Sequence, residues 1–186
     1  MGIENKIDID IFKLVTRAIS ESNNIVIMAN HLTQLLVGTL EIKGCSIFIL
    51  NPESKELEAL ASFGLSIDYM TKGPVSYDKN IGSTLGKEPV IIRDVINDDR
   101  LQYPEDAKKE GIGAIASIPI MLYGELVGAL RLYHHETWDI SERDLDSLLL
   151  LSEIIGLAMV YTRNLNVLQS IKGAIDDVHP IWLRNT

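Results

Sequence analysis

A single helical pattern, from Ser141 to Val178, limits the fold of this chain more than any other feature of its sequence. The pattern opens with SERD (141 to 144), a capping box in which the side chains of Ser141 and Asp144 each accept a hydrogen bond from the other's backbone N–H. His179 and Pro180 should end the helix, because the residue before a proline is pushed out of the helical region. About 37 residues at ~1.5 Å each give roughly 55 Å, longer than a small domain is wide.

The distal part of this helix must therefore project from its domain or pair with a partner. Its apolar residues continue at steps of three and four: Tyr161, Leu165, Leu168, Ile171, Ile175 and Val178. Large exposed apolar patches are uncommon on monomers. The pattern predicts a homodimer through the terminal helices, parallel or antiparallel, although the helix could instead fold back on its own domain.

Ahead of this helix, the hydrophobic period changes from helical to strand-like. Residues 8 to 40 predict two helices, with the polar stretch SESNN (20 to 24) between them. Later patterns predict strands over 45–50, 57–63, 90–95, 114–123 and 126–135, and a short helix within 97–111. The turn at Gly124 and Glu125 is expected to join the last two strands as a two-residue hairpin loop.

Composition excludes several kinds of partner. The net charge of −9 opposes binding to nucleic acid or to an acidic membrane, both of which require clustered basic residues. The N-terminus lacks the pattern of a signal peptide, and no run approaches the ~18 consecutive apolar residues of a membrane span. Cys45 is the only cysteine, so the chain can form no internal disulfide and no cysteine zinc cluster. We expect a cytoplasmic protein.

Two adjacent histidines, His134 and His135, follow the last strand. Neighbouring residues on a strand point to opposite faces, so these two side chains are poorly placed to bind one metal ion. We expect a solvated strand end, no metal site and no cofactor.

The expected hairpin loop determines which residues share a face of the sheet. With Gly124 and Glu125 as the loop, one face is bulky and the other is lined by small residues. The bulky face holds Ile115, Ser117, Met121, Leu126, Leu130 and Leu132. The roomier face holds Ala114, Ala116, Ile118, Val127, Ala129, Arg131 and Tyr133. A one-residue bulge at the turn would exchange the two faces.

Arg131 and Tyr133 on the roomier face are the first candidates for a binding site. A buried arginine is costly unless it is paired, and its planar fork suits a carboxylate or phosphate. We hypothesise that both residues face a ligand cavity, with the anionic partner supplied by a ligand or by Asp94. The alternative is an arginine at a solvated edge or in an ordinary internal ion pair.

Three segments carry a resemblance to a known family. GKEPVIIRDVINDDRL (86 to 101), EGIGAIASIPIMLYGELVGALRLY (110 to 133) and DISERDLDSLLLLSEIIGLAM (139 to 159) resemble, in order and spacing, the sequence of GAF domains. The resemblance implies an α+β, profilin-like fold. Its antiparallel sheet of five or six strands has the N- and C-terminal helices on one face and a ligand cavity on the other. The implied division is an N-terminal helix (1–21), a GAF domain (22–162) and a C-terminal helical extension (163–186).

The same resemblance implies a sensory domain of signalling proteins, such as those of two-component systems, rather than an enzyme. Phe63, Tyr69, Met70 and Tyr103 fall in segments that border the pocket in the family, beside Ala116, Ile118 and Ala129 of the roomier face. The family's free-methionine sulfoxide reductases use several cysteines, so a diverged reductase is the weakest alternative here. A dimerisation module without a ligand is the stronger one, because NIGSTL (80 to 85) replaces a usually longer segment.

Overall fold

The computed structural model describes residues 7–76 and 87–183, with side chains as far as Ile175. Its centre is a six-stranded antiparallel sheet in the order β3-β2-β1-β6-β5-β4. The strands are β1 (Gly44–Leu50), β2 (Glu56–Phe63), β3 (Val75–Ser76), β4 (Val90–Ile92), β5 (Ala114–Leu122) and β6 (Glu125–His134). The expected α+β fold with an antiparallel sheet is confirmed.

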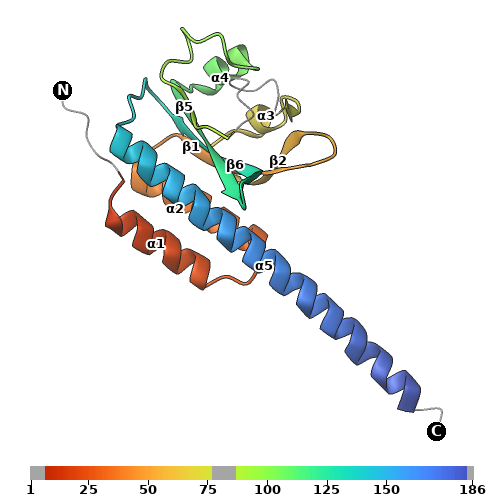
Figure 1. Ribbon diagram of the computed structural model, residues 1–186. Coiled ribbons are helices and arrows are strands. Elements are labelled where there is room, and N and C mark those ends of the chain that lie inside the picture. Colours follow the sequence, from red (N-terminus) through yellow and green to blue (C-terminus); the bar gives the residue numbers. More distant parts are fainter. Residues whose placement is uncertain (1–6, 77–86, 184–186) are drawn as a thin grey trace.

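Long helices cover one face of this sheet and short helices lie over the other (Figure 1). The long ones are α1 (Ile9–Ser20), α2 (Ile25–Leu40) and α5 (Glu142–Leu183), and the short ones are α3 (Ile67–Met70) and α4 (Pro104–Glu110). The break expected at 20–24 is present, and Asn24 caps α2 by accepting hydrogen bonds from the N–H groups of Val26 and Ile27. Helix α4 ends at Gly111, whose φ of 75° is the left-handed conformation that glycine adopts readily.

The core on the long-helix face is apolar and closely packed. Leu148, Leu151 and Ile155 of α5 are fully buried together with Leu32 and Leu36 of α2. Ile11 and Val15 of α1 belong to the same core, so the N-terminal helix packs on the domain that follows it. At roughly 1.5–3 kcal/mol for each fully buried large aliphatic side chain, this face is the main source of stability.

The last hairpin differs from the expected register by one residue. Tyr123 and Gly124, with φ angles of 51° and 78°, form the loop, and a bulge follows between Ile120 and Met121. Ser117 therefore lies opposite Arg131, whereas Ala116 lies opposite Leu132. The expected loop was wrong because tyrosine rarely adopts a positive φ, which favoured Gly124 as the first loop residue.

That shift moves the alanines of β5 to the long-helix face. Ala116 and Ile118 are fully buried in the core beneath the helices. The predictions that these two residues line a cavity beside Arg131 are therefore wrong. On β6, Ala129, Arg131 and Tyr133 do share the opposite face, as expected.

Helix α5 begins as expected and continues further than expected. Ser141 Oγ accepts a hydrogen bond from the Asp144 N–H at 3.0 Å, and Asp144 Oδ1 accepts one from the Ile7 N–H at 3.1 Å. The carboxylate of Asp144 thus connects the start of α5 to the N-terminal segment. The helix runs through His179 and Pro180 to Leu183, so the expected end at Val178 is wrong. The preference of a pre-proline residue is a bias, which a long continuous helix can override.

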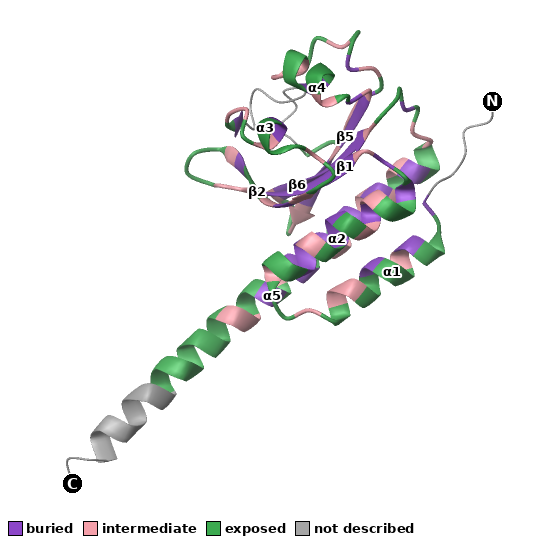
Figure 2. Ribbon diagram, turned by 180° about the vertical axis from the view of Figure 1, so that it is seen from behind, coloured by how far each residue is buried: buried purple, intermediate pink, exposed green. Residues whose placement is uncertain are grey.

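Beyond the domain, α5 extends away from the sheet, and its residues between Tyr161 and Ile175 are mostly exposed (Figure 2). Over Glu142–Ile175 this helix is long and apolar enough to cross a membrane by length and composition. That is only a weak indication, because Leu148, Leu151 and Ile155 in its first half are core residues of the domain.

Candidate functional site

Arg131 occupies the middle of the sheet face opposite the long helices. Its side chain is buried, with 8% of the residue exposed. Its Nε donates to Ser117 Oγ at 3.2 Å, and its guanidinium carbon lies 5.3 Å from the centre of the Phe48 ring. No ion pair involves Arg131 within residues 7–76 and 87–175. Within that part of the chain, neither the solvated edge nor the internal ion pair describes this arginine.

Hydroxyl groups and a thioether lie on the same face, on the neighbouring strands. Ser46 on β1 and Ser62 on β2 are directly opposite each other, with their Oγ atoms 2.9 Å apart. The hydroxyl of Ser62 also points at the sulfur of Met70 in α3, at 3.3 Å. Arg131 thus lies among small neutral groups that can form hydrogen bonds but do not neutralise its charge.

Two tyrosines link the sheet to the short helix α3. The rings of Tyr69 and Tyr133 meet edge to face, with centroids 5.9 Å apart. Burial raises the pKa of both phenols, and the nearby positive charge of Arg131 acts against that rise. Both phenols are therefore neutral hydrogen-bonding groups at physiological pH.

Lys72, just after α3, brings a second cation to the site. Its Nζ lies 3.6 Å from the centre of the Tyr69 ring and donates to the Tyr69 carbonyl oxygen at 2.7 Å. Burial, followed by repulsion from Arg131, lowers the pKa of Lys72 to about 8. Lys72 could not be identified from the sequence, because a lysine in a turn-rich segment carries no pattern that distinguishes it from a surface lysine.

A polar cluster fixes the short helices over this face. Glu110 at the end of α4 accepts hydrogen bonds from the N–H and hydroxyl of Ser66, which caps α3, and lies 3.6 Å from the ammonium of Lys43. Burial alone would raise the pKa of the Glu110 carboxyl, but the hydrogen bonds from Ser66 and the charge of Lys43 outweigh it and hold that pKa below its usual value. Glu110 is thus an ionised anchor that is already paired.

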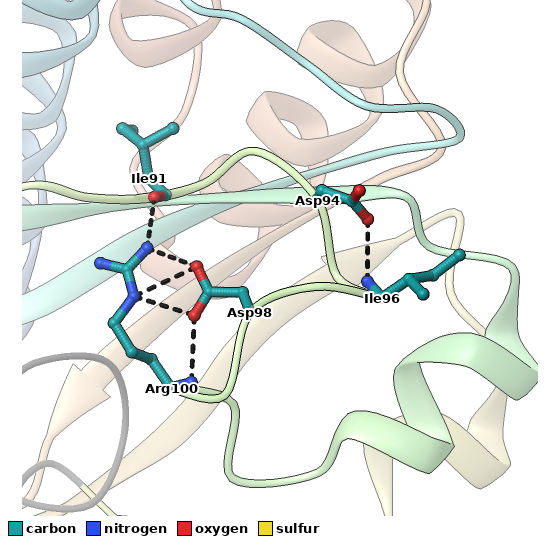
Figure 3. Close-up of polar contacts among 5 residues, drawn as sticks. All are labelled: Ile91, Asp94, Ile96, Asp98 and Arg100. Atoms are coloured by element: carbon teal, nitrogen blue, oxygen red, sulfur yellow. Dashed lines mark hydrogen bonds and ion pairs between the residues drawn. The ribbon is translucent and has the colours of Figure 1, made fainter.

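Asp94 does not pair with Arg131, so this part of the hypothesis is wrong. Its carboxylate caps its own loop, accepting from the N–H of Ile96 at 2.9 Å (Figure 3). It also accepts from the side-chain amide of Asn97 at 2.6 Å. In the same loop, Arg100 forms a fork with Asp98 and donates to the Ile91 carbonyl. Both aspartates therefore serve the loop that follows β4, because short side chains readily close such turns.

The predicted site residues separate into two groups. Arg131, Tyr133, Tyr69 and Met70 come together on one face, with Ala129 beside Phe48 and Tyr103 at the rim. The Tyr103 hydroxyl donates to the Pro74 carbonyl at 2.9 Å, so this residue positions the segment after α3. Phe63 lies opposite Cys45 on the long-helix face and is 44% exposed, so its prediction as a pocket residue is wrong.

The histidines and the cysteine lie away from this constellation. The ring of His134 stacks near Trp138, with centroids 5.3 Å apart, and its Nδ1 accepts from the Glu136 N–H. No group of three potential metal ligands occurs among residues 7–76 and 87–175. Cys45 is fully buried in the core under the long helices, where burial raises the pKa of its thiol.

The cavity-size prediction based on NIGSTL (80 to 85) lies outside the described residues. One open groove of about 860 Å³ is found elsewhere, between the β1–β2 turn and the distal part of α5. Its lining includes Ile49, Leu50, Val167 and Ile171, and it is separate from the Arg131 face.

This arrangement defines a class of domain in which one sheet face is sealed by terminal helices and the other carries polar groups under short helices and loops. The GAF domain family model matches residues 25–159, and the chain belongs to the GAF domain family. GAF domains are generally sensory or regulatory. A search of curated proteins found no match to the sequence.

Solved structures show the same fold at low identity. The GAF domain of a phosphoenolpyruvate-protein phosphotransferase from Coxiella burnetii is 19% identical, with a TM-score of 0.75, covering 90% of this chain and 99% of that one. A domain of a putative two-component sensor histidine kinase from Sinorhizobium meliloti is 20% identical, with a TM-score of 0.63 and coverages of 76% and 94%. Free methionine-R-sulfoxide reductase from Neisseria meningitidis, in complex with its substrate, is 11% identical, with a TM-score of 0.68 and coverages of 88% and 98%.

Proposed function

We propose that this chain is a cytoplasmic sensory domain of a signalling protein, such as a two-component system. It binds a small anionic ligand on the Arg131 face and transmits occupancy through a homodimer of α5. The observation that carries the proposal is the buried Arg131, which has no ion-pair partner among the described residues.

The charge of the buried Arg131 favours an anionic ligand. A buried guanidinium without a counter-ion is costly, whereas a carboxylate or phosphate forms two parallel hydrogen bonds with its planar fork. Ser46, Ser117 and Tyr133 offer hydroxyl groups beside it. A small anion therefore gains more from this face than from water-exposed lysines elsewhere on an acidic protein.

Transmission follows from the chain connection. Strand β6, which carries Arg131, ends at His134, and α5 begins at Glu142. A ligand that binds one arrangement of β6 and the short helices better than another shifts the population between them. Helix α5 is coupled to the sheet, since Ser152 on α5 donates a hydrogen bond to the Pro119 carbonyl of β5 at 2.9 Å.

The homodimer is supported by an uncovered stripe on α5. Leu150, Leu157, Tyr161, Leu168, Ile171 and Ile175 are each more than half exposed. Together with Ile154 and Asn164 they follow alternating steps of four and three, the period of a coiled-coil seam. Asn164 is the single polar residue in this seam.

A thermal-shift screen of acidic metabolites tests ligand binding. At least one anion should raise the melting temperature of the native protein, and Arg131→Met should abolish that shift while leaving the fold intact by circular dichroism. Arg93→Met is the matched control, because Arg93 is exposed and pairs with Asp139 on the surface. An equal shift in all three proteins would refute the proposal.

The dimer is tested by light scattering after size-exclusion chromatography. Leu168→Glu and Ile171→Glu place charges in the seam and should yield monomers, whereas Gln169→Glu, on a neighbouring face, should remain dimeric. A native protein that is monomeric at tens of micromolar would exclude this mode of transmission.

The second candidate is a dimerisation module that binds no ligand, which a negative screen with an intact dimer would favour. A reductase is disfavoured by Cys45, whose buried thiol has a raised pKa and is therefore a poor nucleophile.

A further inference from the structure

We infer that the ligand carries two anionic groups, one bound by Arg131 and the other by Lys72, and that a small dicarboxylate is the minimal example. This inference rests on the proposed function, because it specifies the ligand of the same face. Nothing in the sequence pattern marks Lys72, so the second half of the site comes from the geometry alone.

The ammonium of Lys72 is held in a defined position. The Tyr69 ring lies beneath it at 3.6 Å, the Tyr69 carbonyl accepts from it at 2.7 Å, and the Tyr103 ring centre is 5.6 Å away. An aromatic face stabilises a cation but does not neutralise its charge. A fixed ammonium with hydrogen-bonding capacity remaining is prepared for an anion.

The nearby carboxylates do not neutralise Lys72. Glu110 is engaged by Ser66 and Lys43, and Asp106 is exposed on α4. Neither lies within ion-pairing distance of Lys72, although both charges favour its protonated form. Among the described residues, the acidic neighbours therefore leave the ammonium without an ion-pair partner.

Among the described residues neither cation has an ion-pair partner, so a ligand with two anionic groups would balance both charges. A carboxylate bound by the guanidinium of Arg131 uses both of its oxygens in the forked geometry. Such a pair removes the repulsion from Arg131 that disfavours the charged lysine, but it leaves the ammonium itself unpaired. A second anionic group on the same ligand completes the pairing.

The surface between the two cations suits a short connecting chain. The Tyr69 and Tyr133 rings connect α3 to β6, and Met70 and Phe48 add apolar surface near them. These groups offer van der Waals contact to a few methylene carbons, while the cations hold the two ends. A ligand with a long or bulky connecting chain would not need two cations held on the same face.

Isothermal titration calorimetry with malonate, succinate, glutarate and adipate, each compared with butyrate, tests the inference. We expect at least one dicarboxylate to bind the native protein about 10- to 100-fold more tightly than butyrate, the gain typical of a hydrogen bond to a charged group. Lys72→Met should reduce that dicarboxylate to the affinity of butyrate and leave butyrate unchanged. Lys109→Met, an exposed lysine on α4, is the control and should bind as the native protein does.

A second measurement is the proton uptake that accompanies binding. Because binding restores the charge of Lys72, the dicarboxylate should take up a fraction of a proton at pH 8, seen as a dependence of the binding enthalpy on the buffer. The uptake should vanish in Lys72→Met. A merely structural lysine would change stability but not this proton count.

The outcomes separate the two proposals. Equal affinity for butyrate and all dicarboxylates, with no effect of Lys72→Met, overturns the inference and leaves the Arg131 site standing. Failure of every dicarboxylate to bind also overturns it. The thermal-shift test with Arg131→Met does not depend on Lys72. The proposed function can therefore hold even when the second cation plays no part.

Discussion

The two faces of this sheet are built from alternate residues of the same strands, yet they have opposite chemistry. On β6, Leu130 and Leu132 are fully buried against the long helices, whereas Arg131 and Tyr133 point to the short helices. The first face is continuous aliphatic core. The second adds hydroxyls, phenols and two cations to smaller apolar clusters, with ion-paired carboxylates at its edge.

This difference indicates a division of labour within one element. The helix face supplies the free energy that holds the sheet in place, through close packing of aliphatic side chains. The polar face can then keep Arg131, which has no ion-pair partner among the described residues, at a cost that the other face offsets. A face built for stability alone would not place arginine at its centre.

The largest expected effect is on the helix face. Leu132→Ala removes a fully buried side chain from the core and should lower the free energy of unfolding by about 2–5 kcal/mol. Urea denaturation followed by circular dichroism measures it. Ile67→Ala, at a position that is 81% exposed on the other side, should change stability little. Similar losses in both variants would erase the proposed contrast between the faces.

The next effect is at the link between the chain's N-terminal segment and α5. Asp144→Ala leaves the buried N–H of Ile7 without its carboxylate acceptor and should lower the free energy of unfolding by about 1–3 kcal/mol. Hydrogen exchange should also show faster opening of residues 7–20. Asp146→Ala, exposed on the same turn of the helix, is the comparison, and an equal change there would mean that the contact with Ile7 contributes nothing.

A smaller effect is expected on the polar face. Arg131→Met removes a buried charge but keeps most of the side-chain volume, so the free energy of unfolding should change by less than about 1 kcal/mol or should rise. The same urea titration applies. A loss greater than that of Asp144→Ala would show that Arg131 is a structural residue and would weaken its assignment to a ligand.

A further effect concerns pH and Lys72. Its pKa is about 8 in the folded protein against the usual 10.5, so between these values the unfolded chain binds a proton that the folded chain does not. Stability from this group therefore rises with pH across that window. The difference in unfolding free energy, native minus Lys72→Met, should increase from pH 7 to 9.5. The stability that both proteins lose at alkaline pH through Cys45 and the tyrosines cancels in this difference. A difference that does not change with pH would contradict the low pKa of Lys72.

Much of the fold was predictable because local rules agree with one another. The break at 20–24, every strand except β3 and the short helix before Gly111 all follow from period, capping and turn chemistry. The hairpin register did not follow, because Tyr123 adopts a positive φ and the bulge at Ile120 and Met121 adds one residue. That single residue moved Ala116 and Ile118 to the helix face.

The candidate site was only half predictable. Arg131 and Tyr133 emerged from alternation along β6, whereas Lys72 required knowledge of how α3 folds back over the sheet. Partners across a fold leave no trace in one sequence, as the pairing of Glu110 with Ser66 also illustrates. Asp94 was wrong because an aspartate just after a strand more readily closes its own turn than reaches a distant cation.

The length of α5 amplifies a small tilt at its start. Its 42 residues form one uninterrupted rod rooted beside the strand that bears Arg131. At ~1.5 Å per residue, a tilt of about 5° at the root would swing the tip by roughly 5 Å. A tilt too slight to disturb the sheet would thus move the far end of α5 by about the length of a side chain.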